Sequence, residues 1–99
     1  MTIKVTVNYD YTQKELLGEK DVFEIPAGTT LSGLLRKIDI MIIDAGKSRG
    51  IDTTRKTTLA EGNLNACVVF VNGSAPTGML EQELYEGDTI EFVYGFCGG

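Results

Sequence analysis

The strongest constraint on this chain is that one segment has apolar residues at helical spacing, whereas the segments on both sides alternate as strands do. The helical segment covers about residues 30–42, with Thr29 or Thr30 as its N-cap. Its apolar face consists of Leu31, Leu34, Leu35, Ile38 and Ile42. An amphipathic helix must bury such a face against another layer, and strands are the other apolar elements. We therefore expect a two-layer α+β domain.

Four strands are predicted around this helix. Alternation of period two predicts strands at 3–9 and 90–94, and short apolar runs predict strands at 22–25 and 67–71. The first two strands are expected to form a hairpin. Strand, strand, helix, strand and strand is the order of the β-grasp fold, a mixed sheet of four to five strands packed on one main helix.

The segments between these elements are polar and contain glycine or proline. Residues 10–20 are predicted to be a long turn, and residues 44–58 a mobile loop. Residues 74–80 are predicted to be irregular. We expect a single folded domain over residues 1–94, followed by a flexible tail over residues 95–99.

The chain of 99 residues contains no histidine and only two cysteines, Cys67 and Cys97. Catalysis by serine–histidine or cysteine–histidine pairs is therefore excluded, as are zinc sites that use histidine. Two thiolates are too few for the usual iron–sulfur cluster, so we expect no metal. They are also too few for a disulfide scaffold, which favours a reducing compartment. Cys67 lies in an apolar strand and is expected to be a buried, unreactive thiol.

Neither a membrane span nor a targeting signal is predicted. The longest unbroken aliphatic run is residues 40–43, whereas a spanning helix needs about 20 apolar residues. Residues 1–11 alternate between polar and apolar side chains, unlike a signal peptide. The expected location is the cytoplasm.

Charge is distributed unevenly along the chain. Residues 57–99 contain six acidic residues and no lysine or arginine. This half is not expected to bind nucleic acid, because phosphates would be repelled. It suits a basic partner surface, with Glu86 and Glu91 as candidate contacts. Solubility alone is the other explanation of the same charge pattern.

The sequence ends with Gly98 and Gly99, a short distance after the last predicted strand. Glycines lack Cβ, so such a tail can enter a narrow channel and present the carboxylate of Gly99 as its reactive group. Residues 95–99 reach about 16 Å when extended, at roughly 3.3 Å per residue. This length is enough to reach a partner's buried site.

Three further motifs precede this tail: VNG at 71–73, LYEGD at 84–88 and IEF at 90–92. With the terminal Gly-Gly, they resemble the MoaD/ThiS sulfur-carrier family, which is ubiquitin-like in fold. The resemblance is clearest over residues 59–99, and over residues 1–43 only the order of elements agrees. In these motifs the chain is more similar to the small subunit of molybdopterin synthase than to the thiamine carrier.

The resemblance implies a protein co-substrate rather than an enzyme. An ATP-dependent adenylating enzyme would activate the Gly99 carboxylate, and a sulfur donor would convert it to a thiocarboxylate. The sulfur would pass to a large synthase subunit or another acceptor, with molybdopterin favoured over thiamine and tRNA. The chain itself would bind no cofactor and could act as the small subunit of a synthase.

Two other functions remain open. A ubiquitin-like modifier would need the same tail, with Gly99 joined to lysine side chains. The other is a β-grasp module that binds partners without covalent chemistry, in which the Gly-Gly tail would have no function.

Three residues near the tail or on the sheet have alternative roles. Cys97 either provides a thiol beside the reactive carboxyl or simply fits a channel as a small residue. Phe96 is expected to anchor the tail in a partner's groove, although it could fold back on its own core. Phe70 has the opposite parity to Val69 and Val71, so it either contributes to a contact patch on the open face of the sheet or packs in the core.

Overall fold

The order of elements agrees with the sequence pattern and adds several short elements. The computed structural model describes residues 1–54, 56–65, 67–76 and 78–94. Its elements are β1 (Thr2–Asn8), α1 (Tyr11–Leu17), β2 (Lys20–Pro26), α2 (Leu31–Arg49), β3 (Leu59–Ala60), β4 (Asn63–Leu64), β5 (Cys67–Val71), the 3₁₀ helix η1 (Met79–Glu81) and β6 (Thr89–Tyr94).

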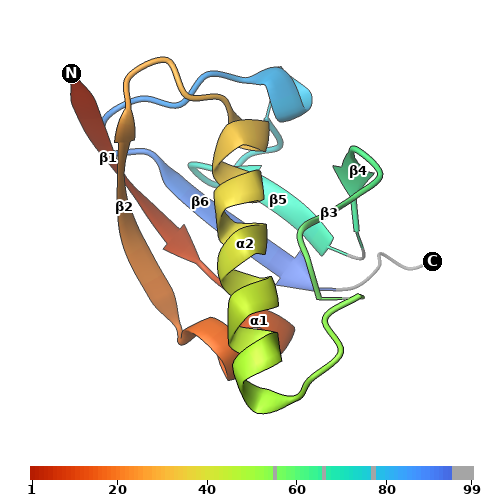
Figure 1. Cartoon of the computed structure of the whole chain (residues 1–99). Coiled ribbons are helices and arrows are strands. Elements are labelled where there is room, and N and C mark those ends of the chain that lie inside the picture. Colours follow the sequence, from red (N-terminus) through yellow and green to blue (C-terminus); the bar gives the residue numbers. More distant parts are fainter. Residues whose placement is uncertain (55, 66, 77, 95–99) are drawn as a thin grey trace.

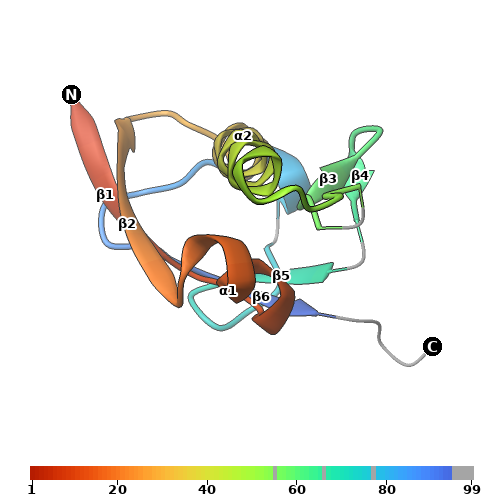
Figure 2. The same ribbon diagram turned by 60° about the horizontal axis from the view of Figure 1, so that its bottom comes forward.

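The main sheet has four strands in the order β2-β1-β6-β5, and α2 crosses one of its faces (Figure 1). β1 pairs with β2 in the antiparallel sense, so the predicted hairpin is confirmed. β1 and β6 are parallel, and β5 and β6 are antiparallel, which makes the sheet mixed. Figure 2 views α2 nearly end-on and shows it to one side of the sheet. The α+β architecture with one main helix is confirmed.

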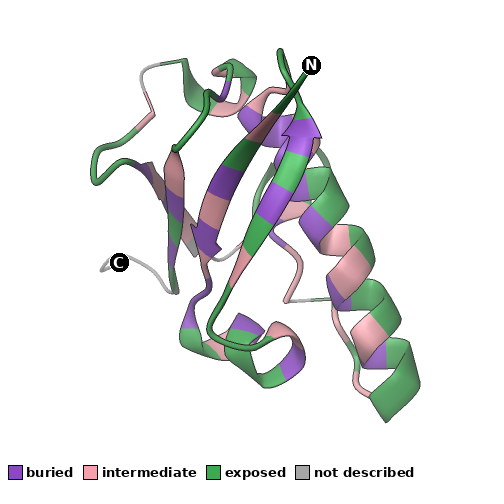
Figure 3. Ribbon diagram, turned by 90° about the vertical axis from the view of Figure 1, so that its left-hand side faces the viewer, coloured by how far each residue is buried: buried purple, intermediate pink, exposed green. Residues whose placement is uncertain are grey.

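The core lies between α2 and the sheet. All five residues of the predicted helical face are fully buried: Leu31, Leu34, Leu35, Ile38 and Ile42. Facing them are alternate strand residues such as Val5, Val7, Ile90 and Phe92. Figure 3 shows the resulting alternation of buried and exposed positions along the strands. Among the residues that the structure describes, no helix covers the opposite face of the sheet (Figure 2).

The prediction of a long turn over residues 10–20 is wrong, because a short helix, α1, occupies Tyr11–Leu17. Asp10 caps this helix: its Oδ1 accepts hydrogen bonds from the backbone of Thr12 and Gln13, both at 2.9 Å. Gln13 Oε1 in turn accepts from the Asp10 backbone N–H at 3.0 Å, which completes a capping box. Leu16 is the apolar residue that this helix buries. A single buried apolar residue gives no helical periodicity, so the capping residues Asp10 and Gln13 were the signal in the sequence.

The predicted end of the main helix at residue 42 is also wrong, because α2 continues to Arg49. Gly46 allows this extension to pack: a Cβ there would lie 2.2 Å from Cγ2 of Thr53. Gly50 then ends the helix in the left-handed conformation, with φ at 69°. Residues 44–49 are therefore helical, and the predicted loop is shorter than expected.

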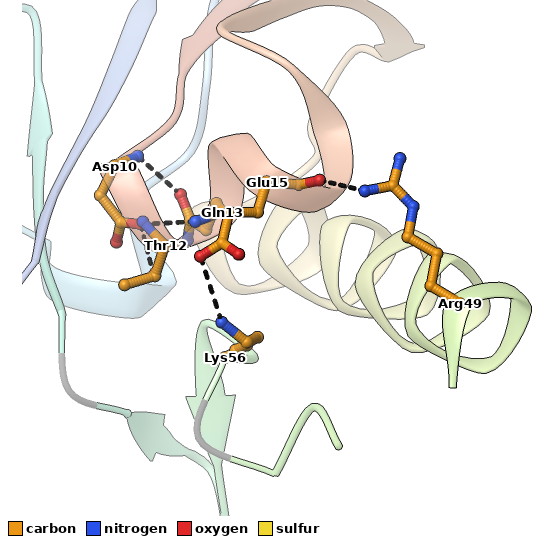
Figure 4. A network of polar contacts seen from close by, with 6 residues as sticks. All are labelled: Asp10, Thr12, Gln13, Glu15, Arg49 and Lys56. Atoms are coloured by element: carbon orange, nitrogen blue, oxygen red, sulfur yellow. Dashed lines mark hydrogen bonds and ion pairs between the residues drawn. The ribbon is translucent and has the colours of Figure 1, made fainter. Parts of the chain in front are cut away.

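Polar contacts attach the end of α2 and the following loop to α1 (Figure 4). The Arg49 guanidinium donates to the Glu15 carbonyl, and Lys56 Nζ lies 3.8 Å from Glu15 Oε1. Further along, Asp39 of α2 accepts hydrogen bonds from the backbone of Thr58 and Leu59, at 2.6 and 3.1 Å. These bonds hold the start of the small β3–β4 hairpin against the main helix.

Candidate functional site

The predicted tail residues Phe96, Cys97, Gly98 and Gly99 lie outside the described residues. The described chain reaches Tyr94, the last residue of β6. The boundary between a folded domain and a tail at residues 94 and 95 thus stays a prediction. The structure describes the surface around the end of β6, from which the chain continues into the tail.

Phe70 and Glu91 lie opposite one another in the antiparallel pair of β5 and β6. Their sequence neighbours are buried under α2, with Val69 3% and Val71 5% exposed. Because successive strand residues point to opposite faces, Phe70 and Glu91 belong to the uncovered face of the sheet. Of the two positions that the sequence left open for Phe70, the structure supports the open face of the sheet, where this residue is half-buried; its role in partner contact stays a prediction.

Two valines that the sequence analysis did not single out belong to the same surface. Val68 pairs with Val93 in the next register position, and Val93 is 46% exposed. We call Val68, Phe70, Glu91 and Val93 the open-face patch. The sequence indicated that the patch residues of each predicted strand point to one face, because they occupy alternate positions. Only the pairing of β5 with β6 shows that the two sets lie side by side.

The open-face patch lies at the end of the sheet from which the chain continues to residue 95. Val93 directly precedes Tyr94, and Tyr94 is the register partner of Cys67. A partner that covers the patch would therefore also meet the first residue of the tail. Apolar side chains beside one acidic residue suit a surface that is buried by packing and oriented by charge.

Glu86 lies before β6, in the turn that leads into it, and its role as a partner contact stays a prediction. β6 runs from Thr89 to Tyr94, which separates the turn at Asp88 from the tail by about 20 Å at roughly 3.3 Å per residue. Glu86 Oε1 also accepts a hydrogen bond from the Lys4 backbone N–H at 3.0 Å. The carboxylate of Glu86 is thus part of the connection between this turn and β1.

The acidic residues of the C-terminal half are distributed over several surfaces rather than one face. Glu61 and Glu81 line a groove against α2, together with Arg36 and Asp39. Glu91 lies on the opposite face of the sheet. Uniform charge along a sequence therefore does not give a uniformly charged face, because these residues belong to different elements of the fold.

The VNG and EGD motifs are joined by side-chain hydrogen bonds. Asn72 Nδ2 donates to Asp88 Oδ1, and Asn72 Oδ1 accepts from the Thr89 backbone N–H, both at 2.9 Å. Asp88 Oδ2 also accepts from the Tyr85 backbone N–H at 2.9 Å. Gly73 and Gly87 have positive φ in these turns. The motifs thus position β5 against β6, and with them the open-face patch.

Within residues 1–54, 56–65, 67–76 and 78–94 the structure shows neither a candidate metal site nor a candidate membrane-spanning helix. No group of three or more acidic or cysteine side chains there could hold a metal ion. None of the helices in that part of the chain is both long and apolar enough to cross a membrane.

Comparisons with known proteins agree with this geometry. The sequence profile of the ThiS family matches residues 5–99. Among solved structures, a putative molybdopterin converting factor, subunit 1, from Pyrococcus furiosus has a TM-score of 0.69 and 22% identity, over 95% of this chain and 99% of that one. Small archaeal modifier protein 1 of Haloferax volcanii has a TM-score of 0.69 and 16% identity, over 95% and 99%.

A third structure, Urm1 from Trypanosoma brucei, has a TM-score of 0.64 and 20% identity, over 99% of this chain and 97% of that one. No curated protein sequence matches the chain. At these identities the solved structures establish the fold, and the profile match over nearly the whole chain establishes the family. The chain belongs to the ThiS family of ubiquitin-like β-grasp proteins, whose members are small sulfur carriers or modifiers rather than enzymes.

Proposed function

We propose that this protein is a sulfur carrier that is activated at the carboxylate of Gly99. An adenylating enzyme would join this carboxylate to the AMP part of ATP and release pyrophosphate. A sulfur donor would then displace AMP, which leaves a thiocarboxylate on Gly99. Transfer of that sulfur to an acceptor, with water supplying the replacing oxygen atom, would return the carboxylate. ATP is bound by the partner enzyme in this scheme, and the carrier supplies the substrate group.

The observation that carries this proposal is the position of the open-face patch beside the start of the tail. Val93 of the patch is separated from residue 95 by Tyr94 alone. Burial of Val68, Phe70 and Val93 against a partner would fix the tail's origin relative to that partner's active site. The family match also extends to Gly99, so it includes the Gly-Gly sequence.

Molybdopterin synthesis is the pathway we favour for the sulfur. The likeness to the putative molybdopterin converting factor subunit supports this choice, as do the VNG and LYEGD motifs. In that role the chain would serve as the small subunit beside a large synthase subunit. A reducing cytoplasm fits this chemistry, since thiols are kept reduced there.

A ubiquitin-like modifier is the second candidate, and the likeness to small archaeal modifier protein 1 favours it. Its Gly99 carboxylate would end in an isopeptide bond to a lysine side chain. The two functions share the adenylation step and differ in the product. Intact-mass analysis of the protein from its own cell distinguishes them: a carrier gains the mass difference between sulfur and oxygen, and a modifier appears in lysine conjugates.

Activation itself is tested by ATP–pyrophosphate exchange with the cognate adenylating enzyme. We expect exchange with the full chain and none after removal of Gly98 and Gly99 or addition of residues beyond Gly99. Circular dichroism of the truncated protein should be unchanged, because the described core ends before the tail. Undiminished exchange by the truncated protein would overturn the proposal.

A further inference from the structure

The outer edge of β2 offers unpaired backbone groups to another strand. β2 is at one end of the sheet order, and in the described chain no strand pairs with its outer side. Two backbone hydrogen bonds show which residues of β1 and β2 bond to each other: the Tyr9 N–H donates to the Glu19 carbonyl, and the Ala27 N–H donates to the Met1 carbonyl, both at 3.0 Å. Odd-numbered residues of β2 therefore bond to β1, and the N–H and C=O groups of Val22 and Glu24 point outward.

The other edge of the sheet is already partly covered. Val71 of β5 donates its N–H to the Ser74 carbonyl at 2.9 Å and accepts the Ser74 N–H at 3.1 Å. Pro26 is the last residue of β2. Its backbone belongs to the outward-pointing set, but it has no N–H to offer to another strand. The open length of β2 thus runs from Lys20 to Glu24. A strand from another molecule would find its hydrogen-bonding partners there.

A groove of about 320 Å³ lies between the end of β2 and the first half of α2. Ile25 and Leu34 are buried residues that contribute to its apolar surface, and Ile40 forms a wall that is 62% exposed. Gly33 lines it without a side chain. A strand added to β2 would direct every second side chain toward α2, and therefore toward this groove.

The charge of the groove opposes that of the protein as a whole. Arg36 and Lys37 line it, and no acidic residue does. Both side chains are exposed, and within the described ranges neither takes part in an ion pair. The complete chain has a net charge of −5. A local cationic rim on an acidic protein favours carboxylates in whatever occupies the groove.

We propose that the outer edge of β2 and this groove form a docking site for an extended segment of a partner protein that is rich in aliphatic and acidic residues. The segment pairs with the backbone of Val22 and Glu24. Its aliphatic side chains enter the groove, and its carboxylates lie near Arg36 and Lys37. Backbone pairing supplies general affinity, and the groove and its rim supply sequence preference.

The position of the site makes it independent of the tail. Pro26, which lines the groove, is the register partner of Thr2 at the start of β1. The tail follows Tyr94 at the opposite end of the parallel strand β6. The two sites are thus at opposite ends of the sheet. A partner bound at β2 can hold the protein while another enzyme acts on Gly99.

A display library of random peptides, selected against the folded full-length protein, tests this proposal. We expect enriched peptides in which aliphatic residues occur at alternate positions beside acidic residues. In an NMR titration with the synthesised consensus peptide, amide shifts should change at Val22, Glu24 and the first half of α2. They should remain unchanged at Phe70 and Val93 of the open-face patch.

Two matched pairs of variants separate the backbone contribution from the charge contribution. Val22→Pro removes one outward N–H and should weaken peptide binding about tenfold or more, whereas Val22→Thr keeps the N–H and should bind normally. Lys37→Glu should weaken binding and reduce its salt dependence. Lys47→Glu, the same change in the last turn of α2, should have little effect.

Ile40→Asp is a second test of the groove that does not alter the strand, because this side chain is largely exposed. It should weaken binding even if Val22→Pro perturbs folding. Several results would overturn the proposal: no enrichment, enrichment of basic peptides, or binding insensitive to both Lys37→Glu and Ile40→Asp. Concentration-dependent shifts at Val22 and Glu24 without peptide would assign the edge to a second copy of this chain and would equally overturn it.

Discussion

Asn72 donates a hydrogen bond from Nδ2 to Oδ1 of Asp88 at 2.9 Å, and this bond joins the turn after β5 to the turn before β6. The same amide accepts from the Thr89 backbone N–H, also at 2.9 Å. Two motifs separated by about a dozen residues in the sequence are thereby one structural unit. Their role is to set the pairing of β5 with β6, on which the open-face patch depends.

Replacement of Asn72 should show how much this unit contributes to stability. Asn72 has a φ of 53°, so Asn72→Gly removes the side-chain bonds without backbone strain, whereas Asn72→Ala adds that strain. We expect a loss of about 1 kcal/mol in the free energy of unfolding for Asn72→Gly and about 2 kcal/mol for Asn72→Ala. Urea denaturation measures both. Equal losses would contradict the strain argument.

Asp39 should be important for the β3–β4 hairpin. Its carboxylate accepts from the backbone of Thr58 and Leu59 and from Thr58 Oγ1, the last at 2.7 Å. Asp39→Ala leaves these donors unpaired and should cost about 2 kcal/mol. Limited proteolysis should then cleave residues 56–65 faster than in the wild type. Asp44→Ala, an exposed change on the same helix, is the control, and equal cleavage in both variants would count against this anchor.

Tyr9 should make the protein sensitive to alkaline pH. Its buried ring stacks on Phe92 with centroids 6.4 Å apart, and its hydroxyl donates to Asp21 Oδ2 at 2.8 Å. Burial first, and then the bond to Asp21 and its charge, raise the pKa of Tyr9 well above its usual value. The unfolded chain releases this proton near pH 10, and the folded chain keeps it to higher pH. The stabilisation is therefore complete below about pH 10 and is lost as pH rises further.

Tyr9→Phe separates this effect from other alkaline titrations. The slope of unfolding free energy against pH should be steeper for the wild type than for Tyr9→Phe, by up to about 1.4 kcal/mol per pH unit. Below pH 9 the variant should lose about 1 kcal/mol from the missing hydrogen bond. Tyr85→Phe, at a 61% exposed position, should keep the wild-type slope. Equal slopes for the wild type and Tyr9→Phe would refute the assignment.

The open-face patch should control binding to the adenylating enzyme. Phe70→Ala removes an apolar contact and should speed dissociation about tenfold, with a smaller effect on association. Glu91→Lys should slow association and flatten its dependence on salt, because charge acts mainly on the encounter. Stopped-flow binding at low and high salt measures both rates.

Asp44→Lys provides the matched control for this charge change, since Asp44 is exposed on α2 away from the uncovered sheet face. It should leave both rates near those of the wild type. Glu86→Lys is a poorer probe, because it also removes the acceptor for the Lys4 backbone N–H. Association that is indifferent to salt in the wild type would assign the acidic residues to solubility.

Cys97 is expected to act as a small residue rather than as a reactive thiol. Cys97→Ala and Cys97→Ser should therefore retain most sulfur transfer to the acceptor, measured as thiocarboxylate turnover with the partner enzymes. A loss of about 100-fold in both variants, equivalent to about 2.7 kcal/mol of barrier, would instead show that the thiol takes part. A loss in one variant alone would point to the fit of the side chain.

Local patterns in the sequence determined the four strands of the main sheet, the start of α2 and the face that α2 buries. Thr30 caps α2 as predicted, with its Oγ1 accepting from the Gly33 backbone N–H at 3.2 Å. These features depend on neighbours within about four residues, because helix and strand periodicity and capping bonds are local. The motifs near the end of the chain likewise identified the family without knowledge of their contacts.

Tertiary structure decided the length of α2 and the composition of the candidate site. In the last turns of α2, Gly46 lies so close to Thr53 that a side chain would not fit there, and no helical periodicity encodes this contact. Phe70 and Glu91 became neighbours, and Val68 and Val93 joined them, through the register of β5 and β6. Register depends on packing between segments far apart in the chain, so the sequence pattern supplied the candidate residues and only the folded sheet could select among them.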